Sequence, residues 1–555
     1  MAFPTGWGKK HKLTIDHTKV SGSANLTNFP VYLSGDNFLP DVFTKAAARR
    51  EINANWLLND ANLQGYWRLE SDGSDETANN YDLTAVNSPT HATGKFGNGV
   101  DLERDNTTYY KVASATNLNI TSSKTVSCWI KPESTGLWQT ILTHSDGTTT
   151  GYDFFLTASN TIRFGDWGLT TNDSISSDIT LAVGTWYHVV GIWDATNNVI
   201  SVWVNGVKKS LATTGSSASD TGELRIGADR TSSNAFDGII DDVAVFNRAL
   251  SDYEVKALYY GTADLRFSSD ISGSTELASE VVFFDPDNSL AEVHVKVPTV
   301  SYNTDTDFYV WYEASSEAPY APTATYGSQA VWSDLKYVSS MQGSSEDSTG
   351  ARTTTDTSIS YGTSYGKSGQ GALLTRASSS KIAMSNLGIS GTTAITISGW
   401  IYTTDNDHQR FYNQGVWDSN TAFSFYKHYS IPGLGVTCGN SRDVGCTVTV
   451  NNNTWYHVAC VYPGSGSMMN IKFYLNGVEQ TTASWGAGSG NNPNMADSNY
   501  HFGHLFDGRI DSVRVGNIAR SSDWIATEYA NQNSPSTFVS ATEATSNAIF
   551  FGTNF

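Results

Sequence analysis

The chain uses one stretch of sequence twice, and this duplication limits what it can fold into more than any other feature. Residues 184–206 read GTWYHVVGIWDATNNVISVWVNG, and residues 453–477 read NTWYHVACVYPGSGSMMNIKFYLNG. Each stretch predicts a β-hairpin, because apolar and polar residues alternate on both sides of an Asn/Gly/Ser turn. Four matched pairs keep a separation of 269 to 271 residues: Trp129 with Trp400, Trp186 with Trp455, Asn205 with Asn476, and Asp237 with Asp507. The sequence therefore predicts a duplicated domain, with about 200 residues in each copy.

The composition favours antiparallel β-sheets. Aromatic residues make up 12% of the 555 residues and charged residues only 16%, and long helical patterns are scarce. The formal net charge is −20, and no stripe of Lys or Arg stands out against it. Such a surface repels phosphate backbones, so we expect no nucleic-acid partner. No apolar run approaches the roughly 18 residues of a membrane-spanning helix, so we expect no membrane insertion.

The order of elements predicts a split domain around the first copy. Residues 10–34 and 263–312 are rich in alternating strands and belong to neither copy, so we expect them to form one small β-sandwich with the first copy inserted in a loop. A helix is predicted from Asp41 to about Asn59. The predicted boundaries are 1–48 and 263–316 for the split sandwich, 49–262 for the first copy, 317–332 for a linker, 333–532 for the second copy, and 533–555 for a tail whose apolar end docks as a strand.

The two copies resemble the laminin G-like, concanavalin A-like lectin superfamily, in its bacterial and phage branch. This resemblance is carried by GKFGNGVDL (94–102) and its echo GKSGQGALL (366–374), by the strands SCWIKP and SGWIYT, by the two WYHV hairpins, and by DGIIDDVAVFNRALS (237–251). It implies an all-β fold with two jelly-roll sandwiches. The second copy departs from the pattern at Ser512, where the first has Asp242. A shared ligand site is therefore not implied.

The split domain resembles the domain-of-unknown-function family DUF2341. The stretches GWGKKHKLTIDHTKVSG, LTNFPVYL and AEVHVKVPTVSYNTDTDFYVWY carry this resemblance. It implies a β-sandwich and supplies no activity.

The sequence favours a protein that binds without catalysis. Hydrolases of the lectin-like superfamily carry their carboxylates as Glu-x-Asp-x-x-Glu, and this run does not occur in the sequence. Glu70, Asp72, Asp75 and Glu76 lie in a turn-rich segment that reads as a solvated loop. The matched residues His188 and His457 read as packing residues on strands. A polysaccharide hydrolase remains a second alternative.

Four matched aspartates are candidates for a structural calcium site, which the family resemblance also implies. Calcium prefers six to eight oxygens and often combines carboxylates with backbone carbonyls. A loop Asp together with an Asp at a strand end could begin such a site in each copy, and the alternative is that each carboxylate caps a loop through backbone N–H groups. The candidates are Asp146, Asp241, Asp418 and Asp511.

Four tryptophans are the candidates for binding sugar. A sugar ring needs a flat aromatic side chain beneath its C–H groups and amides or carboxylates around its hydroxyls. Four indoles stand beside Gly, Asp, Asn or Ser instead of in apolar alternation: Trp138, Trp167, Trp417 and Trp485. We expect these residues to lie at the surface.

Cys438 and Cys446 are candidates for a disulfide, because they flank the short loop GNSRDVG. Cys128 and Cys460 lie in apolar strands and are expected to be buried thiols.

These observations predict an adhesion or structural protein with lectin-like domains. The N-terminus lacks the apolar region of a secretory signal, and the domains are of an extracellular type, so we expect the chain on a phage virion as a tail fibre, receptor-binding component or head decoration. The expected partners are cell-surface or capsular glycans and other virion proteins, within an oligomeric assembly. A bacterial or archaeal cell-surface adhesin is the alternative.

Overall fold

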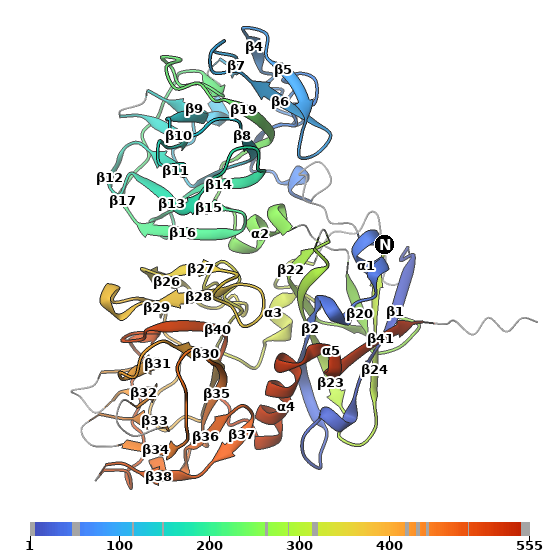
Figure 1. Ribbon diagram of the computed structural model, residues 1–555, viewed down its shortest axis with the longest axis vertical. Helices are drawn as coiled ribbons and strands as arrows, with labels where there is room; N and C mark the ends of the chain where they lie inside the picture. Colours follow the sequence, from blue (N-terminus) through green and yellow to red (C-terminus); the bar gives the residue numbers. More distant parts are fainter. Residues whose placement is uncertain are drawn as a thin grey trace, which may run out of the picture. The chain divides into compact units, whose positions relative to one another are not determined.

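The structure is a computed structural model that divides into two compact units. Residues 49–261 form one unit, and residues 1–48 together with 262–555 form the other (Figure 1). The described residues are 6–46, 56–113, 116–146, 149–260, 265–286, 288–313, 320–416, 421–428, 433–439, 443–486 and 488–544. The fold is all-β, as the composition predicts. None of the helices in the described residues is long and apolar enough to cross a membrane.

The first repeat is a sandwich of two large antiparallel sheets. The eight-stranded sheet consists of β16 (Val207–Ala212), β15 (Val199–Val204), β14 (Tyr187–Asp194), β8 (Lys124–Pro132), β19 (Gly238–Phe246), β6 (Asn98–Leu102) and β5 (Thr90–Thr93), with β3 (Leu63–Trp67) also paired to β19. The seven-stranded sheet runs in the order β13 (Ser174–Thr180), β11 (Thr161–Asp166), β10 (Gly151–Leu156), β9 (Gln139–Ser145), β18 (Leu224–Ile226), β7 (Tyr109–Val112) and β4 (Thr84–Val86). β12 (Leu169–Thr171) and β17 (Thr214–Gly215) form a small ribbon.

The second repeat reproduces this strand order. Its first sheet consists of β37 (Val478–Gln480), β36 (Lys472–Leu475), β35 (Trp455–Tyr462), β30 (Ile395–Thr403), β40 (Gly508–Gly516), β28 (Gly371–Leu374) and β27 (Ser360–Gly362), with β25 (Tyr337–Ser339) paired to β40. Its second sheet runs in the order β38 (Thr482–Ser484), β34 (Asp443–Thr447), β33 (Gly433–Thr437), β32 (Phe423–Lys427), β31 (Gln409–Gln414), β39 (Tyr500–Phe502), β29 (Lys381–Met384) and β26 (Thr354–Thr357). The order matches strand for strand, apart from the added β38, as expected for a duplicated domain.

A small sandwich is assembled from three distant parts of the chain. One sheet runs in the order β21 (Glu276–Leu277), β20 (Arg266–Ser268), β24 (Thr306–Tyr312), β1 (Lys9–Ile15) and β41 (Val539–Glu543), and the other in the order β2 (Leu26–Ser34), β23 (Leu290–Val300) and β22 (Ser279–Asp285). The strand from the C-terminal region pairs with β1, with Leu13 opposite Ala541. The tail thus contributes a strand at residues 539–543, and its predicted apolar end lies outside the described residues.

Helices are few and short. Five α-helices lie in the described residues, namely α1 (Pro40–Lys45), α2 (Asp252–Tyr260), α3 (Ser328–Val331), α4 (Ser522–Asn533) and α5 (Pro535–Phe538). The 3-10 turns are η1 (His17–Lys19), η2 (Gly35–Asn37), η4 (Trp56–Asn59), η5 (Thr116–Leu118), η6 (Arg376–Ser378) and η8 (Met468–Asn470). The predicted helix from Asp41 to Asn59 is wrong as a continuous element, because α1 ends at Lys45, where Ala46 takes an extended backbone.

The small sandwich and the second repeat share one apolar core. Phe29 of β2 packs edge-on against Trp524 of α4 at 5.0 Å between ring centroids, and Ala459 and Val461 of β35 belong to the same buried cluster. Figure 1 shows α4 running between the second repeat and β2 and β23. The predicted linker takes part as well, because Trp332 is buried and its indole N–H donates to Glu280 at 2.6 Å. Residues 320–332 therefore pack as part of the fold.

The predicted disulfide between Cys438 and Cys446 is wrong, and both residues are buried thiols. Thr437 pairs with Asp443 and Leu434 pairs with Cys446, so the two cysteines lie at opposite ends of the β33–β34 hairpin. Four residues of strand separate Leu434 from Cys438, which is about 13 Å at the usual rise per residue. A disulfide requires Cα atoms within about 7 Å.

Candidate functional site

The second sheet of the second repeat presents a polar and aromatic outward face. Ile382, Phe502 and Phe425 point into the core and are buried. Side chains alternate along a strand, so the residues between them face outward. The register places Ala383 opposite His501 and His501 opposite Asn413. These neighbours come from β29, β39 and β31, three strands that are far apart in the sequence.

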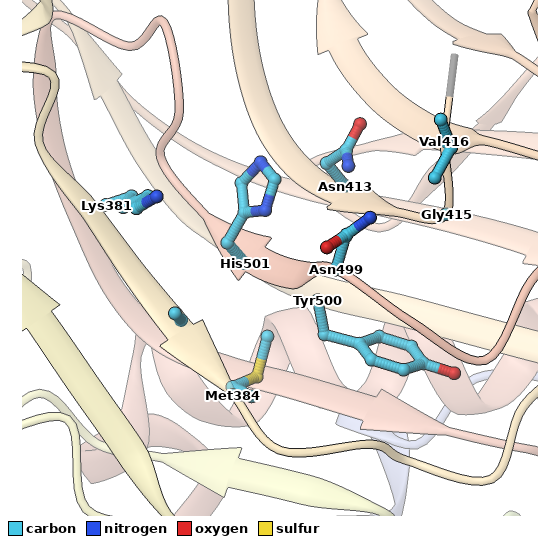
Figure 2. A pocket seen from close by; sticks show the side chains of 9 residues that line it. Lys381, Met384, Asn413, Gly415, Val416, Asn499, Tyr500 and His501 are labelled. Carbon is cyan, nitrogen blue, oxygen red and sulfur yellow. The ribbon is translucent and has the colours of Figure 1, made fainter. Parts of the chain in front are cut away.

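A hollow of about 480 Å³ lies over this part of the face. Figure 2 shows its lining, in which His501 and Asn413 rise from paired positions, with Asn499 beside them and Lys381 on the neighbouring strand. Burial, together with the positive charges of His504 and Lys381, lowers the pKa of His501 to about 4. The imidazole is therefore neutral at pH 7, and because one ring nitrogen donates to the backbone of Asn499, the other nitrogen is an acceptor. The lining is completed by Ala383, Met384, Gly415, Val416 and Tyr500.

The Nε2 atom of His501 is buried and has no hydrogen-bond partner among the described residues. A buried polar atom without a partner is costly, so the imidazole has unused hydrogen-bonding capacity beneath the hollow. The hollow thus combines one amine, two amides and an imidazole, a set of groups that matches the hydroxyl and acid groups of a polar ligand.

A group of aromatic rings continues along the same face. His408 packs on Tyr426 with 4.2 Å between ring centroids, and His428 packs against Trp485 at 5.4 Å. Two glycines make room for the indole, because a Cβ atom would lie 2.6 Å from the Trp485 ring at Gly435 and 2.4 Å from it at Gly445. Trp485 is half-buried in this position. The rings of His408, Tyr426, His428 and Trp485 thus form an aromatic cluster on this face, in which His428 and Trp485 meet edge-on.

The first repeat has its own version of this face. Gln139 and Gln409 occupy the same place, because each side chain accepts a hydrogen bond from the first residue of the Asp-Gly turn, Asp237 N at 2.9 Å and Asp507 N at 2.6 Å. The preceding residues, Trp138 and His408, are therefore equivalent. Trp138 is 43% exposed and packs edge-on against Phe155 at 5.9 Å.

Trp167 lies further along the outward face of the first repeat. Its indole N–H donates to Asp153 Oδ2 at 2.6 Å, and the guanidinium of Arg163 lies 5.4 Å from its ring centre. Arg163 also pairs with Asp153 at 3.2 Å and stands opposite Phe155 in the register. Burial raises the pKa of Asp153 to about 6, although Arg163 opposes the shift. Phe155 and Arg163 thus connect Trp138 to Trp167 across one face.

The structure places three of the four predicted tryptophans, Trp138, Trp167 and Trp485, on these outward faces. Trp417 lies outside the described residues. Sequence reasoning missed Phe155, Tyr426 and the residues of the hollow. Alternation around the buried residues Phe154 and Phe425 could have indicated Phe155 and Tyr426. Lys381, Asn413 and His501 carried no such signal, because isolated polar residues on strands look like ordinary solvent-facing positions.

The predicted calcium ligands do not assemble into a metal site among the described residues. Asp241 Oδ2 accepts from the N–H groups of Lys95 and Phe96 at 2.7 and 2.9 Å. Asp511 Oδ2 accepts from Lys367 N at 2.8 Å and from Ser368 N at 3.1 Å. These carboxylates cap the two GK loops through their Oδ2 atoms, and this was the alternative role considered for them.

Asp146 is also engaged locally. It follows β9 and accepts from the N–H groups of Thr149 and Thr150 at 2.7 and 3.0 Å. Its strand belongs to the other sheet of the sandwich from β19, which carries Asp241. The opposite end of β9, at Gln139, is the end that lies beside β19. Asp146 and Asp241 therefore accept hydrogen bonds from different loops of the first repeat. Asp418 lies outside the described residues.

Comparisons with known proteins place the repeats in a family. A family model described as the concanavalin A-like lectin/glucanases superfamily matches residues 104–256 and 376–526. No curated protein matches the chain. Among solved structures, the binding domain of Paraclostridial Mosquitocidal Protein 1 is 12% identical and covers 87% of this chain and 98% of its own, with a TM-score of 0.32.

Two further solved structures resemble parts of the chain. Domain 4 of AbnA, an extracellular arabinanase from Geobacillus stearothermophilus in complex with arabinotriose, is 20% identical over 36% of this chain and 98% of its own, with a TM-score of 0.29. The Ruminococcus gnavus IT-sialidase CBM40 bound to α2,3 sialyllactose is 14% identical over 27% of this chain and 95% of its own, with a TM-score of 0.23. The family model covers more than half of the residues and falls in both repeats, so this chain belongs to the concanavalin A-like lectin/glucanases superfamily.

Proposed function

We propose that the chain binds carbohydrate through the outward faces of β9–β11 in the first repeat and of β29, β39, β31 and β32 in the second. The observation that carries this proposal is the hollow beside a row of aromatic rings on the second repeat. Aromatic rings can pack against the C–H face of a sugar, while amides and imidazole bond its hydroxyl groups. Membership of a superfamily that contains lectins supports the same reading.

The charge of the hollow favours a sugar that carries an acid group. The chain has a net charge of −20, yet the lining supplies the Lys381 amine, with His504 and Arg410 close enough to act on the charge of His501. A carboxylate or sulfate would pair with the amine and accept hydrogen bonds from the side-chain amides of Asn413 and Asn499. We infer that acidic glycans bind more tightly than their neutral counterparts at this site.

We also propose that the chain binds sugar without cleaving it. Glycoside hydrolysis uses a pair of carboxyl groups on either side of the scissile bond, whereas the hollow is lined by amine, amide and imidazole groups. On the first repeat, Asp153 is buried beneath Arg163 and Trp167. Incubation of the chain with acidic polysaccharides should release no reducing sugar, and measurable release would favour the hydrolase alternative.

A glycan array followed by calorimetry tests the binding proposal. The full chain should bind acidic glycans, and Trp138→Ala and His501→Ala should each weaken binding at their own repeat by about tenfold, the effect of a central contact worth more than 1 kcal/mol. Val183→Ala and Val478→Ala are matched controls, because both side chains are exposed and neither belongs to the strands of the proposed faces. Equal affinity for all four variants, or a blank array, would contradict the proposal.

We further propose that this binding serves adhesion at the surface of a virion, with a cell surface as the alternative. An antibody raised against the chain should decorate intact particles or intact cells without permeabilisation. Labelling only after lysis would contradict both placements.

A further inference from the structure

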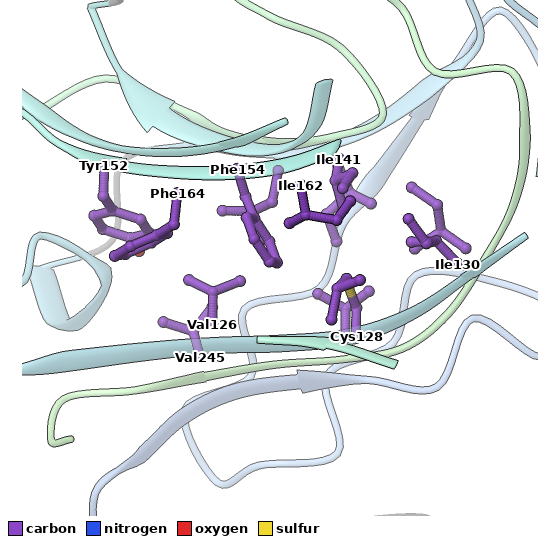
Figure 3. Packing of buried hydrophobic residues seen from close by; sticks show 14 of the residues in the cluster. Val126, Cys128, Ile130, Ile141, Tyr152, Phe154, Ile162, Phe164 and Val245 are labelled. Carbon is purple, nitrogen blue, oxygen red and sulfur yellow. The ribbon is translucent and has the colours of Figure 1, made fainter. Parts of the chain in front are cut away.

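A lysine and an aspartate meet in the core of the first repeat. Lys124 of β8 and Asp166 of β11 form an ion pair, and both side chains are completely buried. The two strands belong to different sheets, so the contact bridges the sandwich. Figure 3 shows this core, with Val126 of β8 on one side and Tyr152 and Phe164 on the other.

The surroundings of the pair are aromatic and buried. The rings of Tyr152 and Trp193 each lie 5.2 Å from Lys124 Nζ. One hydroxyl reaches the pair, because Ser217 Oγ lies 2.5 Å from Nζ and is also hydrogen-bonded to Asp166. Asp166 Oδ1 is buried with no hydrogen-bond partner among the described residues. Burial lowers the pKa of Lys124 and raises the pKa of Asp166, which favours the neutral amine and the neutral acid.

The second repeat shows that the sandwich does not require this pair. Lys124 stands opposite Trp193 in β14, and the equivalent pair in the second repeat is Ile395 opposite Tyr462. Asp166 follows Gly165, which stands opposite Asp153, and the equivalent of Asp166 is Cys438. Ile395 and Cys438 are both fully buried. Since apolar residues fill these positions equally well, and a buried ion pair contributes little net stability, the pair calls for a different explanation.

We propose that Lys124 and Asp166 become joined by an amide bond between Nζ and Cγ, formed by the folded chain itself. The neutral amine attacks Cγ, so that the N–C bond forms and the carbonyl electron pair moves to oxygen. A proton then passes from nitrogen through Ser217 Oγ to the acid hydroxyl. The C–O bond breaks, and one water molecule leaves. No oxidant, reductant or co-reactant is required, and the apolar surroundings favour the neutral amide over the two buried charges.

Such a bond would fix the two sheets to each other. It closes a loop from Lys124 to Asp166 that contains β9 and β10, the strands that carry Phe155 and support Trp138. A covalent link of this kind restricts the unfolded chain and resists mechanical separation of the sheets.

Intact-mass measurement of the purified full chain tests the proposal. The expected mass is lower than the sequence mass by one water molecule, and digestion should yield one branched peptide that contains both Lys124 and Asp166. A mass equal to that of the sequence, in protein kept folded for days, would overturn the proposal. Succinimide formation at the Asp-Gly sequences also removes water, and the peptide map separates the two products because only the amide joins two peptides.

Variants taken from the second repeat provide the control. The double variant Lys124→Ile, Asp166→Cys should fold, because the second repeat has Ile395 and Cys438 at the equivalent positions. Its measured mass should equal the mass calculated from its sequence. A water deficit that persists in this variant, with no succinimide at the Asp-Gly sequences in its peptide map, would also overturn the proposal. Ser217→Ala should contain a smaller bonded fraction at early times after purification, and an unchanged fraction would exclude Ser217 as the proton carrier.

Discussion

At the scale of single residues, the two repeats use matched side chains in different surroundings. His188 of the first repeat contacts Ser127 Oγ at 3.0 Å, whereas His457 of the second contacts Glu528 at 3.2 Å. Arg514 joins this second group at 3.0 Å from Glu528. Arg514 and His457 lower the pKa of Glu528 although burial acts in the opposite direction. The duplicated histidines are therefore packing residues, as the sequence indicated, but only one belongs to an ion network.

A buried histidine in the first repeat predicts acid sensitivity. Burial lowers the pKa of His144 from 6.5 to about 4, so the unfolded chain binds more protons below pH 6.5. The stability that the neutral imidazole supports is present above pH 6.5 and is lost as the pH falls towards 4, by up to about 3 kcal/mol. His144→Phe should flatten this decline, measured by hydrogen exchange of β9 and β10 between pH 7 and pH 4. Equal slopes in variant and parent would contradict the assignment.

Residue-level reasoning from the sequence succeeded where the signal was local. The capping box of Ser251 and Glu254 forms as predicted, with Ser251 N donating to Glu254 at 2.8 Å, and Ser521 caps α4. The loop-capping alternative for Asp241 could be foreseen from its repetition. The sequence could not show that N–H groups bind this carboxylate, because that depends on how the loop at Lys95 and Phe96 folds back onto β19.

At the scale of elements, glycines in β33 and β34 allow an indole to lie flat on the sheet. Both repeats also have a β-bulge at the same place in β19 and β40. Asp242 and Ser512 lie at these bulges and take a left-handed backbone, with φ of 53° and 49°. The sequence showed these positions to be matched but could not show a bulge. The disulfide prediction failed for a related reason, because hairpin register depends on where the turn begins.

Gly445→Ala should displace the Trp485 indole. The added Cβ would lie 2.4 Å from the ring, and overpacking of this kind costs about 1–3 kcal/mol. The change should appear as altered tryptophan fluorescence and as a lower urea midpoint. Gly490→Ala is the control, because its Cβ would meet nothing within 4 Å. Identical spectra for both variants would show that the Trp485 indole does not lie over Gly445.

Besides its apolar contacts, helix α4 holds the small sandwich through a buried side-chain amide. Asn531 accepts from Tyr32 N at 2.7 Å and donates to Tyr32 O at 2.9 Å, and all these groups are buried. Asn531→Ala leaves two backbone groups unpaired and should cost about 2–4 kcal/mol in chemical denaturation. Asn533→Ala, on the exposed side of the same helix, should cost less than about 0.5 kcal/mol. Similar losses in both variants would show that this amide does not hold the two bodies together.

At the scale of the whole molecule, the chain consists of two units, one of which interrupts the other in sequence. The duplication was visible because each hairpin lies within 25 residues. The hollow and the shared core were not visible, because their residues come from segments separated by tens to hundreds of positions, and no local pattern records such pairing. The role of α4 and of Trp332 in joining the small sandwich to the second repeat belongs to this category.

Replacement of residues 49–261 by a short Gly/Ser linker should leave the other unit folded, because its sheets and core are formed by residues 6–46 and 265–544. Calorimetry of the shortened chain should retain one of the transitions of the full chain at an unchanged temperature. A chain that no longer unfolds cooperatively would show that the inserted unit is needed for folding.

The pairing of β41 with β1 has a consequence for synthesis on the ribosome. The first strand made, at Lys9–Ile15, receives its last neighbour only when residues 539–543 have emerged. The inserted unit has all its strands available by residue 261 and can fold first, while the earlier strands wait with open edges. A nascent chain stalled before residue 539 would expose β1 along one side, the kind of edge that recruits foreign strands. The speed of translation between Tyr312, the end of β24, and Val539, the start of β41, therefore determines how long this hazard lasts.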